Sequence, residues 1–383
     1  MANLRMTSRR LRLGAFAGVD ARHIDQRERK SSWWRLTTAV SPVALTILIA
    51  SLALATPASS VQKENPYSIG STILALKLTR LQMLTSKIGV GVAPITTYSG
   101  RLVRAYLVRT DDAGTRWHVT GIFPRAFYPW TTAFATPSVG YVIDGTSALF
   151  THNAGRTWST VKTTGAPLSI SVKGHEVWIP VENCVTSAMQ GPCSTHLDTF
   201  SIGGLSPSAV SPLISDQPML DQVSPTSGYS FEVGSSSGAV LFTSTSGSKW
   251  SVITNPCQSH SISSGVASSL ERIFVFCDIG SPQGSGPTVL FKTIDGGITW
   301  SKVSAVPDVG AGAEVGTSGR FLWVFTPTLW ESSDEGRTWT SDSNVSYGPS
   351  GYIATSTPSR AWHPLPGRGI FRTLDGKKWT LIK

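Results

Sequence analysis

From about residue 71 to the end, the chain alternates short apolar runs with polar turns. Segments such as 289–293 (VLFKT) and 369–373 (GIFRT) alternate apolar and polar positions, which is the pattern of a β-strand with one buried face. Each run is followed by a short polar segment and then by another apolar run, such as 300–303 (WSKV). The pattern predicts many short strands joined by tight turns.

One of these turns recurs and ends each time on tryptophan. Its core is Ser or Thr, any residue, Asp, any residue, Gly, and then Trp three residues later. The copies are TDDAGTRW (110–117), THNAGRTW (151–158), TSTSGSKW (243–250), TIDGGITW (293–300), SSDEGRTW (332–339) and the shorter TLDGKKW (373–379). Self-similarity of this kind indicates a repeat architecture.

The residue types in this turn fit a structural role. An Asp side chain accepts hydrogen bonds from nearby backbone N–H groups, Gly supplies a positive φ, and Trp buries a large ring. Asn153 and Thr245 replace the Asp in two copies and keep a side-chain oxygen, which suits a turn cap better than a metal ligand. The residues predicted to be structural are Asp112, Trp117, Asn153, Trp158, Trp250, Asp295, Trp300, Asp334, Trp339, Asp375 and Trp379.

The spacing of the tryptophans predicts the number of repeats. They lie about 40 to 50 residues apart, except for a double interval between Trp158 and Trp250 that must contain a unit without the motif, near residue 200. Four short strands per unit of this length are the signature of a propeller blade. The prediction is an all-β, seven-bladed β-propeller of four-stranded blades over residues 71–383. Six or eight blades, or two β-sandwiches, are the alternatives; the even spacing without a linker disfavours the sandwiches.

The recurring turn matches the Asp-box (BNR) repeat, so the region from about residue 70 onward resembles the Asp-box β-propellers. That group includes sialidases, sortilin-type receptors, xyloglucan-cleaving glycosidases and photosystem II assembly/stability factors. The assembly factors look closest in size, in having a single exported propeller and in the length of their blades. The resemblance to these factors implies a non-enzymatic scaffold that binds a protein partner on one face, partly through arginine.

The N-terminal segment reads as a targeting signal and not as part of the propeller. Residues 1–36 hold nine Lys/Arg against three Asp/Glu, and residues 39–55 are uncharged and mostly apolar. We predict a basic cytoplasmic leader at 1–36, a signal peptide or transmembrane anchor helix at 37–58, and a linker at 59–70. A leader of this length favours a retained anchor, although small residues at 53–58 also permit cleavage. The charge asymmetry predicts a propeller outside the cytoplasm, anchored to a bacterial membrane or secreted.

The leader also explains most of the formal net charge of +10. Residues 37–383 hold 24 Lys/Arg against 20 Asp/Glu, and no aromatic–basic module follows the patterns that bind nucleic acid. We therefore expect no nucleic-acid partner.

Four cysteines lie in the predicted exported region, and an oxidising compartment makes disulfides the expected state. Cys184 follows the second strand of the third blade and Cys193 precedes its third strand. Cys257 precedes the first strand of the fifth blade, and Cys277 follows its second strand at the same end. We predict the pairs 184–193 and 257–277 and, without Cys-x-x-Cys or paired-His spacing, no metal.

No motif assigns catalytic residues or a cofactor. The main enzymatic alternative is a glycosidase, which needs two carboxyl groups at one cleft. Segment 123–126 (FPRA) does not match the Arg motif of sialidases. The carboxylates that remain outside the repeated turns show no pairing pattern: Asp144, Glu176, Asp221, Glu232, Asp278 and Glu314.

The face opposite the repeated turns is the better candidate for binding. It carries both predicted disulfides and the longest loops, at 182–193 and 278–287, and loops on a rigid scaffold often carry function. The predicted partner-binding residues are Arg125, Trp130, Arg320, Arg360 and Arg368, with Arg104 as a further member. Trp130, between Pro and Thr, is expected to be exposed and able to stack on a sugar. We expect an unidentified protein or glycan partner and a monomeric chain.

Overall fold

The computed structural model describes residues 67–96, 100–124, 127–184, 193–212, 218–233, 239–258, 260–279, 287–306, 314–326, 328–346 and 353–383. The chain divides into two compact units, residues 1–63 and 64–383, and the second contains all the described residues. The predicted leader and anchor helix lie outside the described residues. Among those residues, no helix is both long and apolar enough to span a bilayer.

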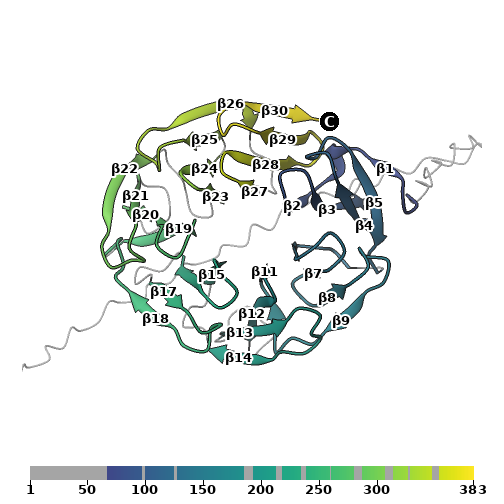
Figure 1. The fold of residues 1–383 in the computed structure, drawn as a ribbon, viewed down its shortest axis with the longest axis horizontal. Coiled ribbons are helices and arrows are strands. Elements are labelled where there is room, and N and C mark those ends of the chain that lie inside the picture. Colours follow the sequence, from purple (N-terminus) through teal and green to yellow (C-terminus); the bar gives the residue numbers. More distant parts are fainter. Residues whose placement is uncertain are drawn as a thin grey trace, which may run out of the picture. The chain divides into compact units, whose positions relative to one another are not determined.

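The described residues form a seven-bladed β-propeller in which each blade is an antiparallel sheet of four strands (Figure 1). Blade 1 consists of β2 (Arg80–Met83), β3 (Gly89–Thr96), β4 (Leu102–Thr110) and β5 (Trp117–Ile122), with β1 (Thr72–Ile73) paired outside β5. Blade 2 consists of β6 (Thr131–Phe134), β7 (Gly140–Ile143), β8 (Ala148–Thr151) and β9 (Ser159–Val161). In blade 3 the first strand is divided into β10 (Ala166–Pro167) and β11 (Ser171–Lys173), followed by β12 (Glu176–Cys184), β13 (Cys193–Ser201) and β14 (Ala209–Pro212).

The remaining four blades repeat the same order. Blade 4 consists of β15 (Pro218–Gln222), β16 (Gly228–Glu232), β17 (Val240–Thr243) and β18 (Ser251–Ile253). Blade 5 consists of β19 (Ser261–Ala267), β20 (Ile273–Asp278), β21 (Thr288–Thr293) and β22 (Ser301–Val306). Blade 6 consists of β23 (Glu314–Ser318), β24 (Phe321–Phe325), β25 (Thr328–Ser332) and β26 (Thr340–Ser346). Blade 7 consists of β27 (Ala354–Thr357), β28 (Arg360–Leu365), β29 (Gly369–Thr373) and β30 (Trp379–Ile382).

The first strand of each blade lines the centre of the ring. β2, β6, β11, β15, β19, β23 and β27 contact one another in that order, and β27 contacts β2, so the ring is closed (Figure 1). The later strands of each blade lie progressively farther from the centre. The prediction of seven four-stranded blades is confirmed.

The hydrophobic core lies between the blades. Every residue of β7, β20 and β24 is buried, because a second strand has a neighbouring blade against each of its faces. Phe274 and Leu290 of blade 5 and Leu322 of blade 6, for example, belong to one buried cluster. Removal of this apolar surface from water supplies the main force that holds neighbouring blades together.

The repeated turns share one hydrogen-bond pattern. In the first copy, Asp112 Oδ1 accepts the N–H of Arg116 at 2.9 Å and the hydroxyl of Thr110 at 2.9 Å. The Thr110 hydroxyl oxygen accepts the N–H of Gly114 at 3.0 Å. The turn needs positive φ at two successive residues, 61° at Ala113 and 88° at Gly114, whereas the sequence had suggested it for the glycine alone.

The same turns also hold each blade against the preceding one. Gly155 packs so closely on Gly121 of blade 1 that a Cβ on Gly121 would collide with its backbone. The Trp158 Nε1–H donates to the carbonyl of Ile122 at 3.0 Å, and the Trp379 Nε1–H donates to Glu331 Oε2 at 2.9 Å. Trp158, Trp339 and Trp379 therefore bond across a blade interface, whereas the Trp117 Nε1–H donates to the Gly114 carbonyl of its own turn.

Blade 3 lacks the motif, and a tyrosine from blade 2 holds its corresponding turn. The Tyr141 hydroxyl accepts the N–H of Gly203 at 2.8 Å and donates to the carbonyl of Gly204 at 3.2 Å. Both glycines lie between β13 and β14, where the sequence placed the missing motif. Burial raises the pKa of Tyr141 to about 12, so its hydroxyl is protonated at neutral pH and able to donate.

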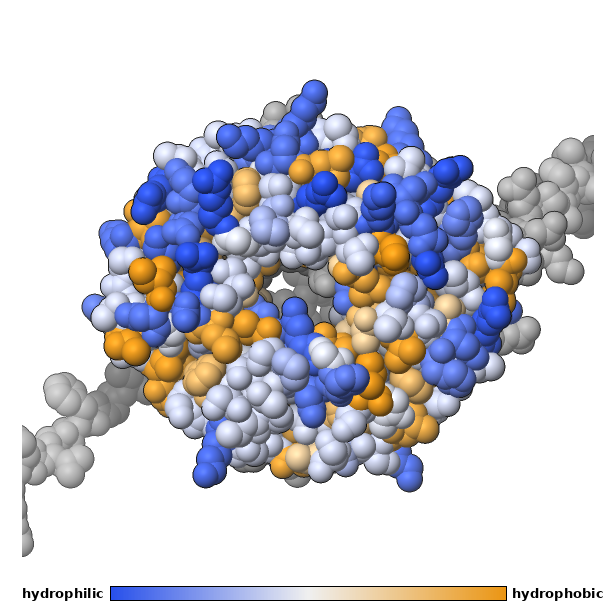
Figure 2. Space-filling view, in the orientation of Figure 1, coloured by the Kyte–Doolittle hydropathy of each residue, from blue (hydrophilic) through white to orange (hydrophobic). Residues whose placement is uncertain are grey.

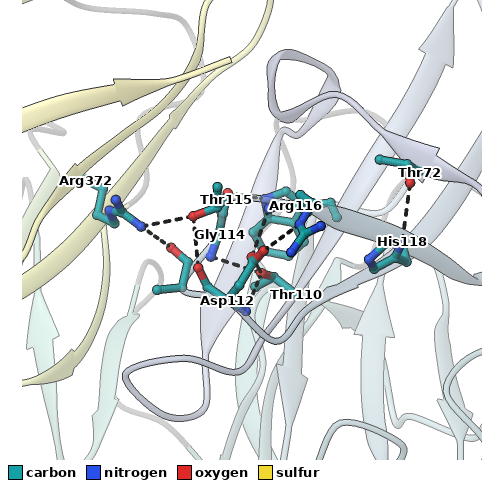
Figure 3. A network of polar contacts seen from close by, with 10 residues as sticks. Thr72, Thr110, Asp112, Gly114, Thr115, Arg116, His118 and Arg372 are labelled. Carbon is teal, nitrogen blue, oxygen red and sulfur yellow. Dashed lines mark hydrogen bonds and ion pairs between the residues drawn. The ribbon is translucent and has the colours of Figure 1, made fainter.

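Blades 1 and 7 meet at a seam that closes the ring (Figure 3). The carbonyl oxygen of Ala113 accepts the Trp362 Nε1–H at 2.9 Å and a guanidinium N–H of Arg372 at 3.1 Å. The 3₁₀ turn η1 (Ala75–Lys77) contacts β28 and β29. All four strands of blade 7 come from the C-terminal residues, so the described chain closes its ring through side chains and packing and not through a shared sheet.

Candidate functional site

The antiparallel order of the strands gives the ring two distinct ends. One end carries the turns between first and second strands and the repeated turns between third and fourth strands; we call it the turn end. The other carries the loops between second and third strands and the connections between blades; we call it the loop end. Any residue in a turn or loop is thereby assigned to one end of the ring.

Both disulfides lie at the loop end and join the pairs that the sequence predicted. Cys184 and Cys193 link the end of β12 to the start of β13, with Cα atoms 4.1 Å apart. Cys257 and Cys277 are buried and link the connection before blade 5 to the end of β20. Two disulfides indicate an oxidising environment outside the cytoplasm. The long-loop residues 185–192 and 280–286 lie outside the described residues.

One group of potential metal ligands occurs among the described residues, and it adjoins a disulfide. Glu182, Cys184 and Cys193 offer atoms within 4.8 Å of one another. Both sulfurs are joined in the disulfide, so neither is available as a thiolate, the form in which cysteine binds a metal.

The arginines proposed as one patch are divided between the two ends. Both Arg320, between β23 and β24, and Arg360, the first residue of β28, lie at the turn end. Arg368 lies at the loop end, between β28 and β29. Arg125 lies outside the described residues. The expectation that these arginines line one face is wrong for Arg320 and Arg360, because each turn is assigned to one end by the direction of its strands.

Trp130 is exposed at the loop end, as the sequence predicted. Its side chain is 51% exposed, and it lies at the start of blade 2. The indole ring of Trp130 lies directly over Gly145, where a Cβ would collide with it. The backbone carbonyl of Trp130 accepts the Arg80 Nε–H at 2.6 Å. The absence of a side chain at Gly145 and the hydrogen bond from blade 1 fix the position of this tryptophan.

Further exposed side chains lie close to Trp130 in the fold. Tyr128 is 43% exposed, and Val103, on β4, is 57% exposed. Their chain neighbours Phe127 and Leu102 belong to one hydrophobic cluster, which is shared by blades 1 and 2. We define the Trp130 surface as Arg80, Arg101, Val103, Tyr128 and Trp130. The sequence analysis identified only Trp130 of these, because the others are recognisable as a group only when β4 is placed beside residues 127–130.

Among the described residues, most of the other tryptophans outside the repeated turns belong to the core. Trp178, Trp323 and Trp362 are fully buried on second strands, and Trp330 is half-buried. Among these tryptophans, Trp130 is therefore the one that presents a large part of its ring to solvent.

The candidate carboxylates are also divided between the ends. At the loop end, Asp144 Oδ1 accepts the N–H groups of Thr146 and Ser147, and Glu232 accepts the N–H of Ala239, so both carboxylates stabilise turns. Asp278 is buried at the same end, and the Glu314 side chain is outside the described structure. At the turn end, Glu176 and Asp221 lie on adjacent blades, and burial raises the pKa of each carboxyl group.

The fold defines the chain as a seven-bladed β-propeller, and several solved structures are similar to it. Neither a protein-family model nor a curated protein matches the sequence. A structure described as YCF48 bound to D1 peptide is 15% identical, with 81% of this chain and 95% of that chain covered and a TM-score of 0.50.

Two enzymes give similar scores over part of their length. The GH74 enzyme of Niastella koreensis is 14% identical, with 81% of this chain and 44% of that chain covered and a TM-score of 0.50. A puromycin-hydrolyzing peptidase of Mycobacterium tuberculosis is 12% identical, with 83% and 56% covered and a TM-score of 0.52. The chain thus spans about half the length of these enzymes. At such identities the likeness establishes the fold, which binding proteins and enzymes share.

Proposed function

We propose that this chain is a non-catalytic propeller scaffold outside the cytoplasm that binds a protein or glycan partner through the Trp130 surface. The observation that carries this proposal is the exposure of Trp130, Tyr128 and Val103 at the loop end, where Arg80 contacts Trp130 and Arg101 precedes β4. Tryptophan, tyrosine and arginine are the residues that most often dominate binding energy at protein interfaces. The similar YCF48 structure, which matches this chain over 95% of its own length, is described as bound to D1 peptide.

The local structure suits such a role because it holds the surface in place before a partner arrives. Trp130 is supported by Gly145 and tied by its backbone to Arg80 of blade 1. Side chains that are already ordered lose less conformational entropy on binding, which leaves more of the interaction free energy for affinity. The surface combines residues of blade 1 with residues at the start of blade 2, so a partner that binds there contacts two blades.

Further parts of the proposal concern the rest of the chain. The repeated turns are Asp boxes with a structural function, as their hydrogen bonds to their own backbone support. Residues 37–58 act as a signal or membrane anchor in a bacterial envelope, and the chain is monomeric. The disulfides support the extracytoplasmic location.

The proposal is tested by pull-down from envelope extracts with the full-length chain. The double variant Trp130→Ala/Arg101→Glu should lose its partner, whereas Arg320→Glu/Arg360→Glu, at the opposite end of the ring, should retain it. Melting temperatures identify any variant that is merely unfolded. Retention of the partner by the Trp130 variant, or equal loss in both variants, would contradict the proposal.

A glycoside hydrolase is the alternative function, and one observation favours it. Burial raises the pKa of Glu176 and Asp221 on adjacent blades, and a glycosidase needs one carboxylic acid that stays protonated near neutral pH. The test is a screen of xyloglucan, sialosides and other glycans for hydrolysis. Turnover that is lost in Asp221→Asn or Glu176→Gln would establish the enzyme and overturn the non-catalytic proposal.

A further inference from the structure

The centre of the ring contains a cavity that the proposed function does not use. It has a volume of about 430 Å³, lies at the turn end and is bordered by the first strands of blades 3 to 7. The opening at the centre of the ring is visible in Figure 2. The wall of the cavity is rich in hydroxyl groups, which belong to Ser268, Thr317, Ser318, Thr355 and Ser356. A cavity of this size can hold a small molecule.

Two opposite charges line this cavity without forming an ion pair. Asp221 projects from β15 and Lys173 ends β11, and both border the cavity. Among the described residues, no salt bridge joins the Lys173 ammonium to a carboxylate. Asp221 Oδ2 accepts the backbone N–H of Ala267 at 2.7 Å, which satisfies one oxygen of the carboxylate.

The environment of Asp221 favours a bound cation. Burial raises the pKa of this carboxyl group, and neither the Ala267 N–H nor the charge of Lys173 fully offsets the cost of burial. A positively charged donor placed against the carboxylate would stabilise the ionised form. The Ser356 hydroxyl on the cavity wall is buried and, within the described part of the chain, has no hydrogen-bond partner. A ligand could supply a positive charge to Asp221 and a hydrogen-bond partner to Ser356.

We infer that the cavity binds a small zwitterion, an amino acid or dipeptide, with its ammonium group against Asp221 and its carboxylate against Lys173. A single cation would leave Lys173 without a counter-charge in the same cavity, and a single anion would face the Asp221 carboxylate. A neutral sugar fits less well, because the described residues that line the cavity include no aromatic ring to stack on it. The hydroxyl groups are suited to the remaining polar atoms of the ligand.

The test is calorimetric titration of the full-length chain with alanyl-alanine, its N-acetyl form, its C-terminal amide and maltose. We expect alanyl-alanine to bind in the millimolar range or tighter, and each blocked form to bind at least about tenfold more weakly, since each loses one charge-assisted contact. This comparison uses the wild-type protein alone. Absence of binding at about 10 mM alanyl-alanine, equal binding of the blocked forms, or preferential binding of maltose would overturn the inference.

Variants then assign the contacts. Asp221→Asn keeps an oxygen for the Ala267 N–H and should weaken the affinity at least about tenfold, as should Lys173→Gln. Two exposed control residues lie outside the cavity lining, and their variants Glu271→Gln and Lys302→Gln should bind as the wild type does. Unchanged affinity in both cavity variants would place the ligand elsewhere. Partner pull-down through the Trp130 surface should be unaffected, so this inference and the proposed function fail independently.

Discussion

At the scale of single residues, the repeated carboxylates act on their own backbone. Asp334 Oδ1 accepts the N–H of Thr338 at 2.9 Å and the hydroxyl of Ser332 at 2.8 Å, which is the arrangement around Asp112 as well. The sequence predicted this role from residue type alone, because a turn cap needs only local partners. It could not reveal the second residue with positive φ, since Ala113, Ala154 and Glu335 are residue types that rarely adopt it.

The first prediction concerns the removal of one cap. Asp334→Ala should lower the free energy of unfolding by about 1 kcal/mol, by analogy with the loss of a helix cap. Urea denaturation measures the change, and Asp111→Ala, an exposed neighbour of the first turn, serves as the control. An unchanged unfolding midpoint for Asp334→Ala would show that this carboxylate does not stabilise its turn.

The second prediction concerns acid. Hydrogen bonds from Thr293 and from the side chain and backbone of Thr299 lower the pKa of Asp295 to about 2. An unfolded Asp titrates near 3.9, so the stabilisation from this group is complete above about pH 4 and is lost as the pH falls towards 2. Urea unfolding at a series of pH values should show a shallower loss of stability over this interval in Asp295→Asn than in the wild type. If the free energy of unfolding depended on pH identically in the two proteins, the lowered pKa of Asp295 would be contradicted.

At the scale of elements, the chain replaces a missing turn motif with a contact from the neighbouring blade. Tyr141 spans the 62 residues to Gly203, and no local pattern could have predicted that pairing. The seven-blade count, by contrast, follows from spacing alone, because each blade is contiguous in sequence and its turns have local signatures.

Removal of the Tyr141 hydroxyl should therefore destabilise blade 3. Tyr141→Phe should lower the free energy of unfolding by about 1 to 2 kcal/mol, because it leaves two backbone groups of the turn without their partner. Tyr128→Phe, which alters an exposed tyrosine, is the matched control. Equal stability of the two variants would mean that water replaces the hydroxyl at no cost.

The buried disulfide should matter more than the exposed one. Cys257–Cys277 constrains a segment with a sequence separation of 20 residues, against 9 for Cys184–Cys193. Loss of the longer cross-link should lower the free energy of unfolding by about 3 kcal/mol, because the unfolded chain gains conformational entropy. The packing contacts of this buried disulfide would be lost as well. Thermal denaturation of Cys257→Ala/Cys277→Ala and Cys184→Ala/Cys193→Ala compares them. A larger effect from the second pair would contradict this ranking.

At the scale of the whole molecule, the ring depends on one seam between blades that are distant in sequence. Arg372 donates to the Ala113 carbonyl and to the Thr115 hydroxyl across this seam. Arg372→Met should lower stability by about 1 kcal/mol and raise amide hydrogen exchange in blades 1 and 7, while blade 4 stays protected. Lys302→Met, on an outer strand, is the control. Uniform exchange in all blades would show that the seam does not open locally.

The candidate surface was less predictable than the ring. The sequence identified Trp130 from its position next to a proline and a tyrosine, yet its partner Arg80 lies 50 residues away. The sequence could have assigned Arg320 and Arg360 to the turn end once the order of the strands was predicted. In an antiparallel blade, successive turns lie at opposite ends of the strands. Whether a cavity forms at the centre depends on several blades together, and no single segment places both Asp221 and Lys173 on its wall.

The seam has a consequence for circular permutation of this chain. Tyr67 and Ile382, near the two ends of the described chain, both pack against the same cluster of blade 1 and blade 7 residues. No blade takes strands from both ends of the described chain. A circular permutant that joins residue 383 to residue 67 and opens between two other blades would preserve every sheet, so the fold does not depend on which blade comes first in the chain.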